Sequence, residues 1–270
     1  MRKRIGITLG DVAGIGPEVI AKALASGKLD RRFDYEIIGN PATKRRRDAF
    51  DWIVAGVRRC LAGDLAALVT GPIAKELVAP WPGQTELLAH LCGTKKFAML
   101  FASDKLRVAL VTTHAPLREV PDLITGRKIG EVIALTRDFC RRIGIRRPRI
   151  AVTGLNPHAG EGGLLGTEER RIIAPAIKRA RAIGPCPADT VFYRALHGEF
   201  DAVIAMYHDQ GLAPFKLLAF DNGVNITIGL PFVRTSPDHG TAPDIAGQGI
   251  ARPAGMIAAI NLAAQLAAKR

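Results

Sequence analysis

The stretch VIAMYHDQG, residues 203–211, joins a run of apolar residues directly to a titratable pair. Val203 to Met206 have the composition of a buried strand, and His208 and Asp209 follow after a single tyrosine. One interpretation is a strand that leaves the core, with polar residues where the backbone meets water. The other is a ligand site, because open α/β sheets bind their ligands beyond the carboxyl ends of parallel strands.

Short apolar runs of this kind alternate with helical patterns along the chain. Strands are predicted at 4–9, 35–39, 66–70, 97–101, 107–112, 149–154, 202–206 and 224–229. Helices are predicted over much of 17–26, 48–62, 84–92, 127–143, 167–183, 189–197 and 253–268. The apolar runs do not alternate strictly with polar residues, as expected of strands buried on both faces. The pattern predicts an α/β fold with a mostly parallel sheet between layers of helices.

Turn-forming and chemically active residues gather after the predicted strands. The segments that follow are DVAGIGPE, GPIAK, THAPL, LNPHAGEGG and YHDQG. Random loops would scatter Gly, Pro, Asp, Asn and His over both edges of a sheet, whereas these segments share the carboxyl edge. The repetition favours a ligand site at that edge.

Three histidines, His114, His158 and His208, directly follow predicted strands and have small or turn-forming neighbours. Three converging imidazoles suit a divalent transition metal that keeps open positions for substrate. The alternative is that each histidine caps its loop by hydrogen bonding. The spacings form no local motif, so the prediction of a metal site depends on the fold. His90 and His197 are assigned to surface or packing positions.

Beyond His208 the polar residues become dense. Asp209, Lys216, Asn225 and Arg234 follow it. Lysine and arginine beside a metal suit a substrate that carries carboxylate or phosphate, and arginine can bind either group in a bidentate way. The alternative for each residue is a solvated surface charge. The segment NPHAGEGGLLGTEE is rich in glycine but has neither the GxGxxG nor the GxxxxGK[ST] spacing, so no dinucleotide or P-loop fingerprint is predicted.

Composition limits the class of protein. The 270 residues suffice for one large or two small α/β units, and 48% are hydrophobic against 6% aromatic, so an aliphatic core is expected. No run approaches the roughly 18 apolar residues of a membrane span, and the N-terminus lacks a signal-peptide pattern. Four scattered cysteines without a CxxC spacing favour reduced thiols in a cytoplasmic protein.

The formal net charge of +13 has two interpretations. It can mark a nucleic-acid-binding protein, or it can steer phosphorylated substrates and anionic cofactors. The basic residues are spread along the chain, and aromatic residues do not interleave with them. We therefore predict no nucleic-acid partner, and we keep a basic RNA- or DNA-binding protein as the alternative outside the enzymes.

Several longer blocks carry a family resemblance over nearly the whole chain. They are ITLGDVAGIGPE, LVTGPIAKE, GQTELLA, VALVTTHAPL, GLNPHAGEGGLLGTEE, GPCPADT, AMYHDQGLAPFK and GVNITIGLPFVRTSPDHGTAPDIAG. In this order they resemble the NAD-dependent 4-hydroxythreonine-4-phosphate dehydrogenases of pyridoxal phosphate biosynthesis. The resemblance implies the isocitrate/isopropylmalate dehydrogenase fold, with two α/β/α domains flanking an active-site cleft. It also implies a homodimer whose site is completed by the second subunit. We expect residues 1–72 plus 235–270 to form a shortened first domain, and 73–234 to carry the metal ligands and the dimer interface.

The resemblance also assigns roles to single residues. The three metal-binding histidines of the family match His114, His158 and His208, for a divalent cation that is zinc, magnesium, cobalt or manganese. Its substrate contacts match Gln84, Thr85, Lys216, Asn225 and Arg234. Contacts to NAD or NADP are expected around His239, Gly240 and Asp244, without a GxGxxG motif. Candidate catalytic residues are Asp189, Asp209 and Lys216.

The implied reaction is oxidation, with decarboxylation, of 4-phosphohydroxy-L-threonine to 3-amino-2-oxopropyl phosphate. Two departures bear on it. Gln84 stands where the family usually has a histidine that helps to hold the substrate phosphate, and the chain is shorter than usual between Asn40 and Ala55. The alternative substrates are a four-carbon sugar-acid phosphate, such as threonate or erythronate 4-phosphate, and a non-phosphorylated diol acid. Phosphate acetyltransferases have a related architecture but do not need three histidines that bind a metal.

Overall fold

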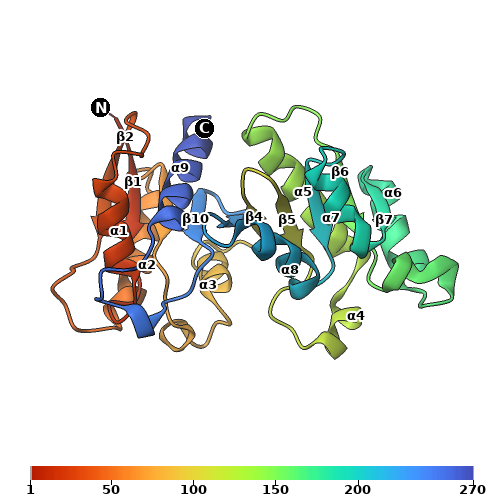
Figure 1. The fold of residues 1–270 in the computed structure, drawn as a ribbon, viewed down its shortest axis with the longest axis horizontal. Coiled ribbons are helices and arrows are strands. Elements are labelled where there is room, and N and C mark those ends of the chain that lie inside the picture. The colour runs from red at the N-terminus through yellow and green to blue at the C-terminus, as the bar shows by residue number, and fades with distance from the viewer. Residues whose placement is uncertain (1, 270) are drawn as a thin grey trace. The chain divides into compact units, whose positions relative to one another are not determined.

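The computed structural model describes residues 2–269. The chain forms two α/β units by its internal contacts. The first unit comprises Met1–Lys95 and Phe220–Arg270, and the second comprises Lys96–Ala219. Figure 1 shows the elements of each unit in chain order.

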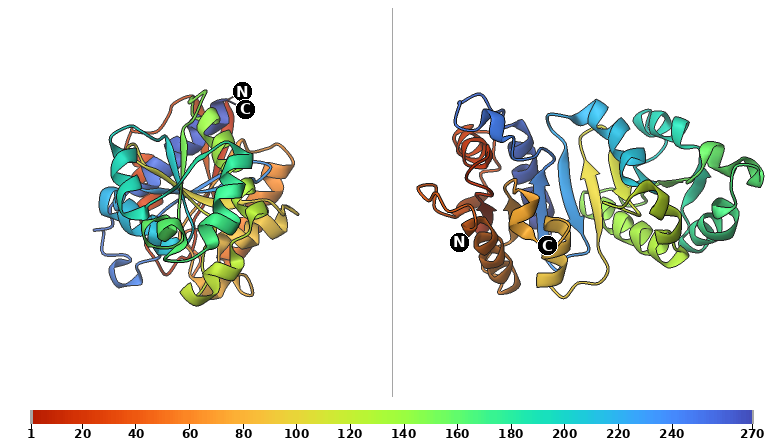
Figure 2. Two further views of the ribbon diagram at one scale, coloured as in Figure 1. Left: turned by 90° about the vertical axis from the view of Figure 1, so that its right-hand side faces the viewer. Right: turned by 90° about the horizontal axis from the view of Figure 1, so that it is seen from below.

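The first unit is built on strands in the order β2-β1-β3-β10-β9. These are β1 (Lys3–Thr8), β2 (Phe33–Ile38), β3 (Ala67–Thr70), β9 (Val224–Ile228) and β10 (Val233–Pro237). Neighbours pair in parallel except for β9, which is antiparallel to β10. The helices α1 (Gly16–Ala25) and α9 (Ala254–Ala268) cover one face of this sheet, and α2 (Asp48–Leu61) and α3 (Gln84–Leu91) the other (Figure 2).

The second unit repeats this plan with strands in the order β4-β5-β8-β6-β7. These are β4 (Ala98–Ala102), β5 (Arg107–Leu110), β6 (Ile150–Thr153), β7 (Ile183–Cys186) and β8 (Ala202–Ala205). The first two pair antiparallel, and β5–β8, β8–β6 and β6–β7 are parallel. Its helices are α4 (Val120–Leu123), α5 (Gly126–Arg142), α6 (Ala174–Ala180), α7 (Ala188–Leu196) and α8 (His208–Ala219).

The core of the second unit shows why its strands lack a polar alternation. On one face Phe101, Val108 and Val203 pack into a cluster that includes Leu212 and Phe215 of α8. The residues between them on the same strands are buried as well, since helices cover the opposite face. Each large aliphatic or aromatic side chain buried in this way contributes about 2 kcal/mol.

The predicted mostly parallel α/β architecture is confirmed, and each of the eight predicted strands is present within two residues of its expected ends. Four of the helices and strands named above were missed. They are β7, which contains Gly184 and Pro185, the polar strand β10, the four-residue helix α4, and helix α8, which contains Gly211 and Pro214. The helix predicted at 167–183 is a π-helical turn at Glu169–Ile173 followed by α6.

The division of the chain differs from the predicted domains of 1–72 plus 235–270 and 73–234. Residues 73–95 and 220–234 lie with the first unit. The reason is strand pairing, because β10 pairs with β3 and β9 pairs with β10. The three candidate metal-binding histidines remain together in the second unit, whereas Asn225 and Arg234 belong to the first.

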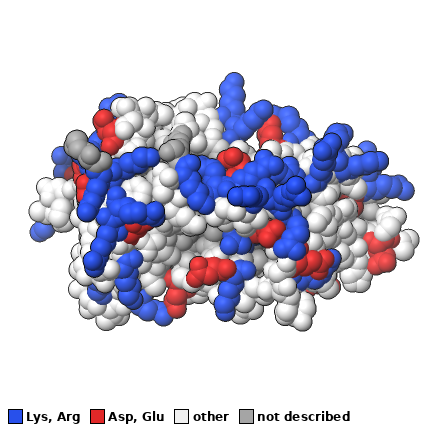
Figure 3. Space-filling view, turned by 90° about the horizontal axis from the view of Figure 1, so that it is seen from above, with Lys and Arg blue, Asp and Glu red and all other residues white. Residues whose placement is uncertain are grey.

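Cysteines and charges are distributed as the composition indicates. All four cysteines are free, and Cys60, Cys140 and Cys186 are buried. Lysine and arginine side chains outnumber acidic ones on the face drawn in Figure 3. Within residues 2–269 no helix has both the length and the apolar character needed to cross a bilayer.

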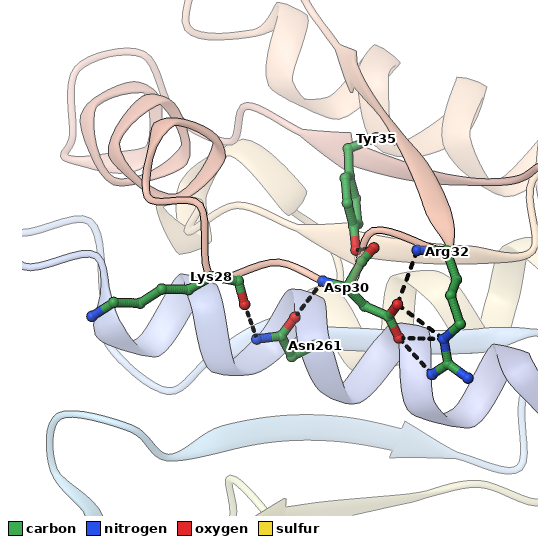
Figure 4. Close-up of polar contacts among 5 residues, drawn as sticks. All are labelled: Lys28, Asp30, Arg32, Tyr35 and Asn261. Atoms are coloured by element: carbon green, nitrogen blue, oxygen red, sulfur yellow. Dashed lines mark hydrogen bonds and ion pairs between the residues drawn. The ribbon is translucent and has the colours of Figure 1, made fainter.

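The C-terminal helix α9 is tied to the turn between α1 and β2 by one amide side chain (Figure 4). Asn261 Nδ2 donates to the carbonyl of Lys28 at 3.0 Å, and its Oδ1 accepts from the backbone N–H of Asp30 at 3.2 Å. Hydrogen bonds from the Arg32 side chain lower the pKa of Asp30. The Tyr35 hydroxyl donates to the Asp30 carbonyl at 2.8 Å. The turn is therefore held from both sides.

The segment before α2 supplies a cation to a buried carboxylate. It lies between Asn40 and Ala55, where the chain is expected to be shorter than its family. Asp11, 1% exposed, lies after β1. Arg46 binds both its oxygens, with Nε 3.0 Å from Oδ1 and Nη2 2.5 Å from Oδ2, and also binds Glu76 at 3.0 Å. Burial alone raises the pKa of Asp11, but hydrogen bonds from Arg46 and from Ala13 N–H outweigh it, so the pKa lies below the ordinary value.

We expect Arg46→Ala to lower the free energy of unfolding by about 2 kcal/mol at neutral pH, because a buried carboxylate loses its cation. In the wild type the contribution of Asp11 is present above the ordinary carboxyl pKa and is lost as pH falls through the lowered pKa. In the variant, burial acts without Arg46 and raises the pKa of Asp11. As pH falls and Asp11 takes up a proton, the difference in unfolding free energy between variant and wild type therefore shrinks. Urea unfolding across a pH series measures this. The matched control is Arg45→Ala, since Arg45 is exposed and makes only a long ion pair of 3.5 Å with Asp48. An equal loss of unfolding free energy in both variants contradicts the prediction.

Candidate functional site

The side chain of a buried arginine reaches the carboxyl end of β3 in the first unit. Arg234 on β10 is 2% exposed. Its Nη2 and Nε donate to Thr70 Oγ1 at 2.7 and 3.2 Å, and its Nη1 donates to Thr227 Oγ1 at 3.0 Å. Nη2 also donates to Gln84 Oε1 at 3.2 Å. We call Arg234 with Thr70, Gln84, Thr85 and Thr227 the Arg234 cluster.

The partners of this guanidinium are hydroxyl and amide oxygens. Burial lowers the pKa of Arg234 to about 10, and the nearby Glu86 carboxylate acts in the opposite direction. The group therefore stays charged at neutral pH, and its desolvation is offset only in part. A buried cation in such surroundings is expensive to maintain unless it binds an anion.

Helix α3 presents its first turn to the same cluster. Gln84 is the first residue of α3, and its Nε2 donates to the Gly71 carbonyl at 3.2 Å while its Oε1 accepts from Arg234. Thr85 Oγ1 lies 3.3 Å from Thr227 Oγ1. The N–H groups of a helix start favour anions. The structure thus brings Gln84, Thr85 and Arg234 together, as a common substrate-binding role requires.

The other two predicted substrate contacts are Asn225 and Lys216. Asn225 is a half-buried residue of β9, in register with Ser236 of β10, and its Oδ1 is buried without a hydrogen-bond partner in the described part of the chain. Lys216 lies on α8 of the second unit. Thr70 and Thr227 were not predicted; the signal available was a threonine at or near the end of a strand, in ALVT and VNITI.

The predicted cofactor loop follows β10 and is held by the start of α1. Its residues His239, Gly240 and Asp244 lie between Pro237 and Arg252. The Ile15 N–H donates to the Thr241 carbonyl at 2.8 Å. Farther on, Lys22 Nζ donates to the carbonyls of Gly249 and Ala251 at 2.7 and 2.8 Å, and Glu18 Oε1 accepts from Ala251 N–H at 2.9 Å. The loop is therefore fixed at both ends while Asp244 stays exposed.

Two of the three candidate metal ligands are adjacent in the second unit. His114 follows β5 and His208 is the first residue of α8, and their ring centroids are 5.5 Å apart. The loops that carry them are joined through strand ends, because Thr112 Oγ1 and Thr112 N–H both donate to the Met206 carbonyl. Within residues 2–269 no group of three or more His, Cys, Asp or Glu side chains is placed to hold one metal ion.

Carboxylates fix the orientation of two of these imidazoles. His208 Nδ1 lies 2.7 Å from Asp209 Oδ1, and His158 Nδ1 lies 2.9 Å from Glu161 Oε2. A proton on Nδ1 leaves the Nε2 lone pair available, and this carboxylate–histidine arrangement is common among metal ligands. The chemistry of these imidazoles therefore suits a divalent transition metal, while the described residues do not gather three ligands at one point. Glu161 was missed because only the distance reveals its pairing with His158.

The remaining candidate catalytic residues are exposed. The side chain of Asp209 is 87% exposed and contacts His208. Asp189 is exposed in the first turn of α7. A residue not predicted, Gln210, joins the histidine loops. Its Oε1 accepts from Met206 N–H and Thr153 Oγ1, each at 2.7 Å, and its Nε2 donates to the Gly154 carbonyl at 2.8 Å.

His158 lies in an unusual backbone segment. All residues from His158 to Gly162 have left-handed φ and ψ angles, and we call this segment the left-handed turn. His158, Ala159 and Glu161 adopt it despite having a Cβ. Each such residue costs about 1–2 kcal/mol, so other contacts must stabilise the turn. Strain of this kind is concentrated at functional sites.

Comparisons with known proteins agree with the fold. Residues 16–263 match the family described as pyridoxal phosphate biosynthetic protein PdxA. A 4-hydroxythreonine-4-phosphate dehydrogenase of Geobacter metallireducens is 42% identical over 325 aligned positions, covering 98% of this chain and 96% of the relative. A D-threonate 4-phosphate dehydrogenase of Salmonella typhimurium is 42% identical over 324 positions, covering 98% and 99%. These alignments exceed the 270 residues of the chain, so the relatives contain residues that it lacks.

Solved structures give the same answer. The crystal structure of 4-hydroxythreonine-4-phosphate dehydrogenase from Klebsiella pneumoniae matches with a TM-score of 0.84 at 41% identity, covering 99% of this chain and 98% of the other. Isocitrate dehydrogenase from Methylococcus capsulatus, at 17% identity and a TM-score of 0.54, covering 94% and 83%, is similar in fold alone. The predicted isocitrate/isopropylmalate dehydrogenase fold class is confirmed, and the chain is a dehydrogenase of that fold. Within that class it belongs to the PdxA family.

We expect Arg234→Met to abolish binding of inorganic phosphate and to change the melting temperature little. Methionine removes a desolvated charge, which favours folding, but it leaves Thr70, Thr227 and Gln84 without their donor, which opposes it. Thermal unfolding with and without phosphate measures both effects. Arg234→Lys is the matched variant, because it keeps the charge but loses the guanidinium geometry. In it, phosphate should raise the melting temperature less than in the wild type; we call this rise the phosphate shift. A full phosphate shift in Arg234→Met would show that the cluster is not an anion site.

Proposed function

We propose that the protein oxidises the secondary hydroxyl of a phosphorylated four-carbon hydroxy acid, with 4-phosphohydroxy-L-threonine as the leading substrate. The observation that carries this is the Arg234 cluster, a buried guanidinium with neutral partners beside the first turn of α3. A substrate phosphate there would receive hydrogen bonds from Arg234, Gln84 and Thr85. Asn225 and Lys216 are further substrate contacts in this proposal.

The histidines would hold a divalent cation, namely zinc, magnesium, cobalt or manganese. His114, His158 and His208 would bind it through nitrogen, with Asp209 and Glu161 keeping two of the rings in the required tautomer. When bound, the cation acts as a Lewis acid on the hydroxyl and the carboxylate of the substrate. The geometry that supports this is the adjacency of His114 and His208 and the two carboxylate contacts at Nδ1.

NAD or NADP would bind at the loop that contains His239, Gly240 and Asp244, and would accept the hydride. The anchoring of this loop by Glu18 and Lys22 supports the role, because a fixed loop loses little entropy on binding. With the cofactor bound, oxidation would remove a hydride from the substrate carbon and a proton from its hydroxyl, giving a ketone β to the carboxylate. Such a β-keto acid would then release carbon dioxide.

The proton steps fall to residues of this chain. Asp189 and Lys216 are the candidates to accept the hydroxyl proton and to protonate the product, and Asp209 orients His208. We also propose a homodimer in which the second subunit completes the site. Exposed apolar side chains of the second unit support this, since Leu164 and Leu217 are 85% and 86% exposed in the single chain.

A second candidate substrate is D-threonate 4-phosphate, which carries a hydroxyl where 4-phosphohydroxy-L-threonine carries an amino group. Gln84 keeps this substrate open, and the relative named for that activity is as similar to this chain, at 42% identity, as the 4-hydroxythreonine-4-phosphate dehydrogenase. A histidine at position 84 can carry a positive charge, whereas Gln84 cannot. Both of its polar atoms also already contact Gly71 and Arg234, so its contribution to phosphate binding is limited.

NADH formation with a panel of phosphorylated and unphosphorylated hydroxy acids tests the substrate. We expect turnover of 4-phosphohydroxy-L-threonine and little turnover without the phosphate. Gln84→His should lower KM for phosphorylated substrates several-fold below about pH 6.5, where histidine becomes cationic, and leave kcat nearly unchanged. Turnover of D-threonate 4-phosphate alone would move the assignment to the second candidate, and no turnover of any phosphorylated acid would overturn the proposal.

Metal content and the histidine variants test the cation. We expect purified protein to bind one divalent ion per chain, and His114→Ala, His158→Ala and His208→Ala each to weaken that binding and to reduce kcat by at least about a hundredfold. His197→Ala is the matched control, since His197 lies at the end of α7 and contacts Tyr193. Full activity of the three variants in metal-free buffer would exclude the proposed role.

A further inference from the structure

We infer that Glu169 is a positioning residue that holds His158 in place through the left-handed turn. The inference rests on the proposed function, because it concerns a residue that would bind the cation. Glu169 is 5% exposed and begins the π-helical turn Glu169–Ile173. Single π-helical turns occur frequently at functional sites. Neither the Glu169 side chain nor the π-helical turn has a part in the reaction described above.

The carboxylate of Glu169 binds the segment that leads into the left-handed turn. Oε1 accepts from the backbone N–H groups of Leu155 and Asn156, each at 2.7 Å. Oε2 accepts from Asn156 Nδ2 at 3.1 Å. Asn156 directly precedes the Pro157–His158 pair, so these three bonds fix the point from which the turn starts. Hydrogen bonds from N–H groups to a carboxylate are roughly twice as strong as neutral ones.

The turn also closes back on the same carboxylate. A Cβ added to Gly160 would lie 2.6 Å from Glu169 Oε2, and one added to Gly154 would lie 2.6 Å from the Cα of Ala159. The backbone of the turn therefore packs directly against the carboxylate and against the end of β6. Gly160 has a φ of 83°, so it is the residue that lets the chain pass this close.

Together these contacts explain how three residues with a Cβ remain in a left-handed conformation. The turn is held at its start by Glu169 and packed at its centre by Gly160 against Glu169. If the carboxylate is lost, the unfavourable backbone angles relax and His158 leaves its position. Glu161, which contacts His158 Nδ1, belongs to the same turn and moves with it.

The test uses the full-length protein and Co²⁺ as the metal probe. Glu169→Gln keeps the size of the side chain but places its amide NH2 against the N–H donors of Leu155 or Asn156. Glu169→Ala removes all three hydrogen bonds. We expect both to raise the Kd for Co²⁺ by about tenfold to a hundredfold, to change its visible spectrum, and to speed amide exchange at residues 155–162. Saturating Co²⁺ should restore kcat of Glu169→Gln to near the wild-type value, which a purely structural defect would not allow.

Two further variants keep the test decisive. Gly160→Ala should weaken Co²⁺ binding to a similar extent, and the double variant Gly160→Ala, Glu169→Gln should show no additive loss, since both act on one contact. Glu119→Gln, an exposed carboxylate of the same unit, is the matched control and should match the wild type. If the wild type binds Co²⁺ and the Glu169 variants bind it equally well with unchanged amide exchange, the inference is overturned. A wild type that binds no Co²⁺ refutes the proposed cation site itself, and the positioning role with it.

Discussion

The first unit depends on one constraint, a permanent positive charge in its core. Arg234 lies on a fully buried strand, and its partners Thr70 and Thr227 are neutral. Such a group lowers stability in the protein alone and becomes favourable when an anion is bound. Strands β3 and β9 and the start of α3 supply the oxygen atoms that surround this charge.

The second unit meets a comparable requirement through its backbone. His114 and His208 come from loops that Thr112 and Gln210 connect to neighbouring strand ends. His158 instead comes from a turn with unfavourable dihedral angles, which only a buried carboxylate makes tenable. The two units thus position their candidate ligand-binding groups by different means, with hydrogen-bonded oxygens around a cation in one and imidazoles held by their loops in the other.

The apolar runs made most of the fold predictable, whereas elements that depend on tertiary contacts were missed. The strand ending at Ala205 was expected, but the helix that begins at His208 was not, because Gly211 and Pro214 are unfavourable in a helix. Gly211 is needed there because a Cβ would lie 2.8 Å from Val108. Likewise β10 has no apolar run, since Arg234 forms the Arg234 cluster and Thr235 Oγ1 donates to the Ala259 carbonyl. Strand ends identified the histidines, but the pairing of Glu169 with Asn156 depends on a distance that no spacing reveals.

The composition of the first unit from both ends of the chain has a consequence for biosynthesis. Strand β3 is synthesised early, but its neighbour β10 and the helix α9 that ties down the turn at Lys28 are made only after the whole second unit. The intervening second unit is continuous and can fold as soon as it leaves the ribosome. During that interval the apolar edge of β3 stays unpaired, so the nascent protein is vulnerable to aggregation until β10 has been made.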